Sequence, residues 1–171
     1  MEQVILVNEN DEEIGFMEKM QAHLEARLHR AFSIFIFNSK NELMLHKRAA
    51  HKYHSGGLWT NTCCSHPEPC ESTIDAAHRR LQQEMGFDCE IKEKFSFLYC
   101  KKLDHDLTEN ELDHVFTGFY ELDPVLNKDE VEDWRFINLE DLQKSLITEP
   151  QLYTEWFRII CDKHWDEIVK S

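Results

Sequence analysis

Twelve residues of this chain, TNTCCSHPEPCE from Thr60 to Glu71, contain three of its six cysteines and one of its ten histidines. Such a cluster suits a disulfide cross-link, a zinc site with sulfur ligands, or an active site with a reactive thiol. A zinc-binding interaction module would use Cys63, Cys64, His66 and Cys70. Adjacent cysteines do not readily bind one tetrahedral ion, and the chain has no C-x2-C pair. An enzyme site is therefore the stronger interpretation.

Imidazoles and carboxylates elsewhere in the chain could bind a metal ion. Glu109 and Glu111 lie two residues apart in TENELDHVF, and in an extended strand such residues point to the same face. Two adjacent carboxylates repel each other, and a divalent cation removes that repulsion. With neutral imidazoles they would suit Zn²⁺, Mn²⁺ or Fe²⁺. The candidate imidazoles are those of His23, His29 and His66.

Residues 72–86 predict a helix, with Ser or Thr at its start and Gly at its end. Arg80 and Glu84 would share one face, either as a surface ion pair or as a phosphate-binding arginine beside a carboxylate that holds Mg²⁺. The pattern of Glu71, Arg79 and LQQEMGF favours the second interpretation. It resembles the end of the Nudix box, a loop–helix–loop that binds Mg²⁺ and diphosphate. The apolar face of the helix is expected to contain Ile74, Ala77, Leu81 and Met85.

The other elements that position these groups are strands and helices without regular βαβ alternation. Strands are predicted at VILV, on both sides of NSKNE as a β-hairpin, and at CEIKEKFSFLYCKKL, HVFTGFYEL and WRFINL. NLEDLQKSLI and the segment after Pro150 predict C-terminal helices. We expect an α+β fold that is Nudix-like: a mixed β-sheet flanked by helices, with a short N-terminal extension and C-terminal helices. One domain is expected over residues 1–171.

Charge and hydropathy exclude several classes of function. The net charge of −14 disfavours a nucleic-acid binder, although a small phosphorylated ligand needs only a few local cations. No apolar run approaches the roughly 18 residues of a membrane helix. The first residues lack the features of a signal peptide, which predicts a cytoplasmic protein with reduced thiols. The disulfide interpretation is therefore the least favoured.

Four motifs in collinear order resemble one branch of the Nudix superfamily, the type I isopentenyl diphosphate isomerases. They are RLHRAFSIFIFN, WTNTCCSHP, RRLQQEMG and ENELDHVF. The main alternative is a Nudix pyrophosphohydrolase, but Arg80 and Gln83 stand where its box has glutamates, and Ser65 replaces a glycine. The resemblance implies that isopentenyl diphosphate and dimethylallyl diphosphate are interconverted by adding a proton at one carbon and removing one from another.

The resemblance also implies roles for individual residues. Cys64 and Glu111 would be acid and base on opposite faces of the substrate, Tyr99 would hydrogen-bond Glu111, and Trp156 would stabilise a carbocation-like species. Glu84 would hold Mg²⁺ with the diphosphate. One Mn²⁺ or Zn²⁺ (or Mg²⁺ or Fe²⁺) would be bound by His23, His29, His66, Glu109 and Glu111. The diphosphate would meet Lys19, Arg48, Lys52 and Arg80. The order of proton transfer and the identity of the metal stay open, and a monomer is favoured.

Overall fold

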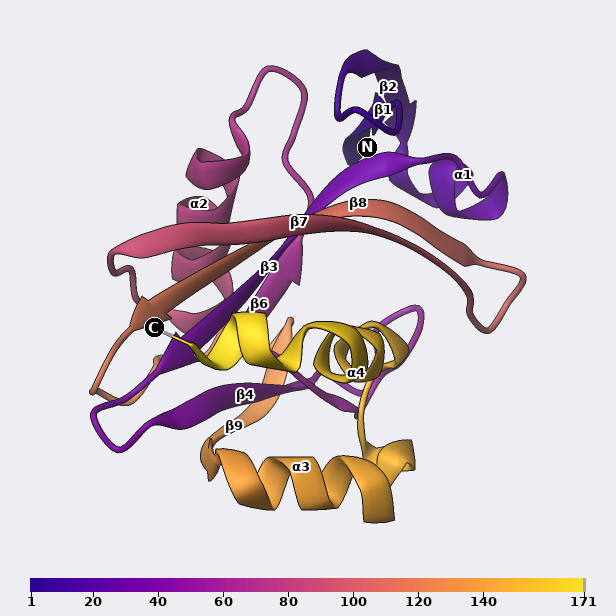
Figure 1. The fold of residues 1–171 in the computed structure, drawn as a ribbon. Helices are drawn as coiled ribbons and strands as arrows, with labels where there is room; N and C mark the ends of the chain where they lie inside the picture. Colours follow the sequence, from indigo (N-terminus) through magenta and orange to yellow (C-terminus); the bar gives the residue numbers. More distant parts are fainter. Residues whose placement is uncertain (171) are drawn as a thin grey trace.

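The computed structural model describes residues 1–170, which form a mixed sheet with helices on both of its faces. In Figure 1, α2 lies on one side of the central strands and α4 on the other. The elements in chain order are β1 (Gln3–Val7), β2 (Glu13–Glu18), α1 (Lys19–Leu24), β3 (His29–Phe37), β4 (Glu42–Arg48), β5 (Trp59–Thr60), β6 (Cys63–Ser65), α2 (Thr73–Met85), β7 (Ile91–Lys102), β8 (Thr108–Phe119), β9 (Val131–Asn138), α3 (Leu139–Thr148), a 3₁₀ turn (Pro150–Leu152) and α4 (Glu155–Val169).

β3 is the strand around which the sheet is organised. It runs parallel to β8 along its whole length, from the pair His29 and Glu111 to the pair Phe37 and Phe119. It also pairs antiparallel with β6. The predicted hairpin is present as a tight connection between β3 and β4, but these strands pair only at Phe37 and Leu43. They diverge because β6 and β8 pair with β3 instead, while β9 pairs with β4.

Alternation along β3 creates two hydrophobic cores. Ile34 and Ile36 point to the face covered by α2, whereas Phe35 points to the face covered by α4. The core on the α4 face also contains Tyr99 and Trp156. The two helix layers therefore lie on opposite faces of the same strands, as expected for an α+β sheet.

The termini of α2 follow the prediction. The Ser72 hydroxyl accepts a hydrogen bond from the Asp75 amide (3.2 Å), and Gly86 ends the helix with a φ of 71°. The predicted apolar face was wrong at Ile74, which is 37% exposed. Ile74 lies in the first turn, before the sheet covers the helix; burial begins at Ala76.

Truncation of Leu81 should test this core. Leu81 is fully buried in α2, so Leu81→Ala is expected to lower the free energy of unfolding by about 2–5 kcal/mol, through lost burial and the cavity left behind. Ile74→Ala, in the same helix, should cost no more than about 0.5 kcal/mol, because Ile74 is partly exposed. Urea unfolding followed by circular dichroism measures both. Equal losses in the two variants would contradict the packing described.

Several elements were not predicted from the sequence. β2 and α1 lie in the expected N-terminal extension, where the Glu18 carboxylate accepts hydrogen bonds from the amides of Met20 and Gln21 and so starts α1. No strand was predicted in the cysteine-rich stretch, yet β5 ends at its first residue, Thr60, and β6 lies within it. No helix within residues 1–170 combines the length and the apolar character needed to cross a lipid bilayer.

Candidate active site and metal centre

Three histidines and a glutamate converge from four parts of the fold. His23 comes from α1, His29 from the start of β3, His66 from the residue after β6, and Glu111 from β8. One ligand atom of each lies within 4.8 Å of the others. Direct pairing of β3 with β8 sets His29 beside Glu111, and all four side chains are largely buried.

The hydrogen bonds of these histidines suit metal binding. Nδ1 of His23 and Nδ1 of His29 each lie 2.7 Å from a backbone oxygen, of Lys19 and of Arg27 respectively. A ring that donates through Nδ1 leaves Nε2 unprotonated and free to coordinate an ion. Nε2 of His29 and Nδ1 of His66 are buried without a hydrogen-bond partner. This donor set fits a divalent transition-metal ion.

The carboxylate of Glu111 lies at the centre of the group. Its Oε1 is 3.0 Å from Nε2 of His66 and 3.4 Å from Nε2 of His29. Burial by itself would raise the pKa of Glu111, but the adjacent imidazoles His29 and His66 hold it well below its usual value. Burial lowers the pKa of His66 to about 4 and also lowers that of His23. Neutral imidazoles around an ionised carboxylate are the protonation states that bind a cation.

Tyr99 joins the two predicted glutamates. Its hydroxyl lies 2.6 Å from Glu111 Oε2 and 3.0 Å from Glu109 Oε2. Burial is the main cause that raises the pKa of Glu109 well above its usual value, and the nearby charge of Glu111 raises it further. A phenol has one proton, so Tyr99 can donate to Glu111 while it accepts from a protonated Glu109. Glu109 lies outside the group of four ligand atoms and is connected to it through Tyr99.

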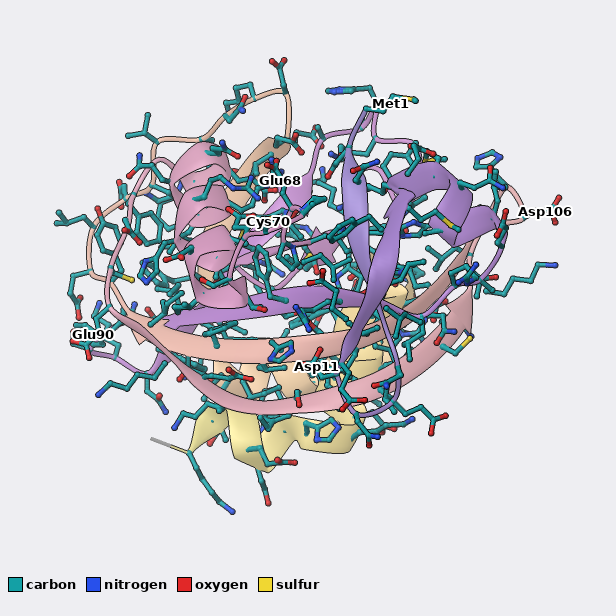
Figure 2. All side chains as sticks on the ribbon, turned by 90° about the horizontal axis from the view of Figure 1, so that it is seen from above. Met1, Asp11, Glu68, Cys70, Glu90 and Asp106 are labelled. Carbon is teal, nitrogen blue, oxygen red and sulfur yellow. The ribbon has the colours of Figure 1, made fainter. Side chains whose placement is uncertain are left out.

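The two adjacent cysteines point to opposite faces of β6. Cys64 lines the cavity, whereas Cys63 is fully buried in the α2 core and its thiol lies 3.4 Å from the Glu84 carboxylate. Burial raises the pKa of the Cys64 thiol, and the positive charge of Arg48 offsets only part of this increase. None of the six cysteines, all within residues 1–170, forms a disulfide. Cys70 is exposed in the loop before α2, near Glu68 (Figure 2).

Four cations also line the cavity, and three of them pair with carboxylates. Lys19 lies 3.2 Å from Glu2, and Lys52 lies 2.6 Å from Glu130. Arg80 contacts Glu84 and also Glu130. The fourth, Arg48, lies over the ring of Trp156, at 5.1 Å from the ring centre.

The structure brings the sequence-predicted residues together in one place. Every predicted site residue except His29 lines the cavity, and His29 lies behind it against Glu111. Sequence reasoning missed Glu2, Glu130, Tyr53 and His54. Glu2 stands alone before the apolar run VILV, and Glu130 lies in the acidic stretch KDEVED, so neither residue could be singled out from the sequence. His54 could have been noticed as a second histidine in the HKYHSGG loop.

Comparison with known proteins identifies the family. Residues 27–157 match the NUDIX domain. Isopentenyl-diphosphate Delta-isomerase 1 of Aromatoleum aromaticum is 54% identical over 162 residues, covering 95% of this chain and 92% of that protein. The isopentenyl-diphosphate Delta-isomerase of Pectobacterium atrosepticum is 46% identical, covering 92% of this chain and 88% of that protein. This chain belongs to the isopentenyl-diphosphate Delta-isomerase family. The resemblance predicted from four motifs is confirmed.

The fold of this family member is that of Nudix proteins. The crystal structure of DR0079 from Deinococcus radiodurans superposes with a TM-score of 0.78, over 95% of this chain and 99% of that chain. Because the two sequences are only 17% identical, this likeness shows the fold and not the activity. The predicted α+β Nudix-like fold is confirmed.

Proposed function

We propose that this chain is an isomerase that interconverts isopentenyl diphosphate and dimethylallyl diphosphate. One observation carries the proposal: the Cys64 thiol and the carboxylate of Glu111 border the same cavity, together with the ring of Trp156. The names of relatives that are about half identical over most of their length support it. A Nudix hydrolase would need the box glutamates that Arg80 and Gln83 replace.

The reaction moves one double bond by two proton transfers. A proton adds to the terminal alkene carbon and leaves positive charge on the substituted carbon; loss of a proton from the chain carbon beside it forms the new double bond. An alkene is a weak base, so the first step needs a strong acid positioned at that carbon. Cys64 and Glu111 are the proposed pair, one as the acid and the other as the base, with Tyr99 holding Glu111 in position.

A divalent ion is proposed at the histidine–glutamate group. His23, His29, His66 and Glu111 would hold it, with Glu109 beside them, and Mn²⁺ and Zn²⁺ suit these donors best. When bound, such an ion makes a neighbouring carboxyl or phenol more acidic. Glu84 would hold Mg²⁺ together with the substrate diphosphate.

Local cations make a diphosphate site possible on an acidic protein. Without such cations, a chain with a net charge of −14 would repel a multiply charged anion. We propose that Lys19, Arg48, Lys52 and Arg80 bind the diphosphate oxygens. Three of these cations pair with carboxylates, so the substrate has to compete with those pairs.

The carbocation-like species needs a π face and a site without water. Trp156 is 6% exposed and borders the cavity, where a desolvated cation–π contact contributes about 2 kcal/mol.

Incubation with isopentenyl diphosphate and Mg²⁺ in D₂O, followed by NMR, tests the proposed activity. We expect dimethylallyl diphosphate with deuterium in a methyl group and no release of phosphate or pyrophosphate. Removal of metal by a chelator should abolish turnover, and addition of Mn²⁺ or Zn²⁺ with Mg²⁺ should restore it. Phosphate release without isomerisation would instead indicate the hydrolase. Full turnover by metal-free protein would contradict the metal assignment.

A further inference from the structure

His54 is a buried histidine in a loop that borders the cavity. The loop connects β4 to β5, yet the His54 side chain is only 6% exposed, which is unusual for a connecting segment. Backbone hydrogen bonds close the loop: the Gly57 amide donates to Arg48 (3.0 Å). At Gly56, a Cβ atom would lie 2.5 Å from the backbone oxygen of Ala50, so the loop packs closely against itself. His54 is therefore held in a defined position.

The ring of His54 contacts the tryptophan of the proposed carbocation site. It meets the Trp156 ring edge-on, with centroids 5.7 Å apart and an interplanar angle of 88°. It also packs edge-on against Tyr53, with centroids 4.4 Å apart. The backbone oxygen of His54 accepts a hydrogen bond from Arg48 (3.2 Å), whose guanidinium lies over Trp156. Two groups that contact the indole ring, the His54 ring and the Arg48 guanidinium, are thus held through His54.

We infer that His54 is a positioning residue, which fixes the indole of Trp156 against the reacting carbons and closes this side of the cavity to water. The inference rests on the proposed isomerase function. An aromatic ring at this position supplies the edge contact, and the loop backbone supplies the link to Arg48.

Loss of this contact has a specific chemical consequence. If water reaches the carbocation-like species, a water oxygen forms a bond to the positively charged carbon and then loses a proton to solvent. The product is a tertiary alcohol that still carries the diphosphate and is heavier than the substrate by one water. A residue that only stabilises the fold would not change the ratio of alcohol to alkene.

The test compares His54→Ala with His54→Phe, with His51→Ala as the control in the same loop, because His51 is exposed. We expect His54→Ala to lower kcat by about 10- to 100-fold, the cost of a misplaced group, with KM changed less than about threefold. Its products in H₂¹⁸O should contain labelled alcohol detectable by mass spectrometry. His54→Phe should recover most of kcat and suppress the alcohol, and His51→Ala should behave as the wild type.

A double-mutant cycle with Trp156→Phe decides whether His54 acts through the indole. In the Trp156→Phe background, His54→Ala should lower kcat much less than it does in the wild type. Additive effects, or a wild-type kcat without alcohol in His54→Ala, would overturn the inference. Thermal unfolding shows whether His54→Ala is folded. If it is not, His54→Gln, which also lacks the aromatic ring, is used in its place. Failure of the proposed function itself would appear as an inactive wild type.

Discussion

Replacement of Cys64 by alanine is expected to lower isomerase turnover by about 10⁴-fold, the upper end of what one general acid or base contributes. Cys64 lines the same cavity as Tyr99 and Glu111. In the proposed mechanism it transfers a proton on one face of the substrate, and Glu111 does so on the other. Cys64→Ser should fall nearly as far, because a hydroxyl gives up its proton much less readily than a thiol. The NMR assay in D₂O measures turnover, and binding of pyrophosphate should stay within about threefold of the wild type, since the diphosphate cations are intact.

Cys70→Ala is the matched control for this prediction. Cys70 belongs to the same cysteine-rich stretch but is exposed in the loop before α2 (Figure 2). It is not one of the residues that line the cavity. Its removal should leave turnover unchanged. If Cys64→Ala retained substantial turnover while it remained folded, the proton-transfer role would have to pass to another group, and the proposed mechanism would be wrong.

Glu111→Gln should abolish turnover and also release the transition metal. Glu111 is proposed both as a proton-transfer group and as a ligand, and its Oε1 lies within 3.4 Å of Nε2 of His29 and of His66. An amide oxygen has no charge to balance a divalent ion, so metal affinity should fall by at least about 10- to 100-fold. Turnover should fall by about 10⁴-fold. Mass-spectrometric metal analysis of the dialysed protein measures the first effect.

Two further variants separate the roles of Glu111. Tyr99→Phe removes the hydrogen bond to Oε2 but no proposed ligand, so it should keep the metal and lower turnover. Glu90→Gln replaces an exposed glutamate and should change neither property. A Glu111→Gln protein that still binds stoichiometric metal would remove Glu111 from the ligand set, even if its turnover were lost.

Local patterns predicted the parts of the site that depend on neighbours in the chain. The ENE motif was predicted to point both carboxylates to one face, and Tyr99 contacts both Glu109 and Glu111. The caps at Ser72 and Gly86 gave the ends of α2 correctly. These features depend on strand alternation and on hydrogen bonds to nearby amides. Both involve only residues that are close together in the chain, so they can be predicted from the sequence.

The sequence by itself determined which residue types exist at this site, through four motifs that identify an isopentenyl-diphosphate Delta-isomerase. Only the tertiary structure decided how they meet. Parallel pairing of β3 with β8 sets His29 beside Glu111, and pairing of β3 with β6 turns Cys64 into the cavity and Cys63 into the core. Likewise, His54 gains its contact with Trp156 only because a loop and α4 pack together. Such registers follow from long-range packing of sheet and helices, and no local pattern specifies them.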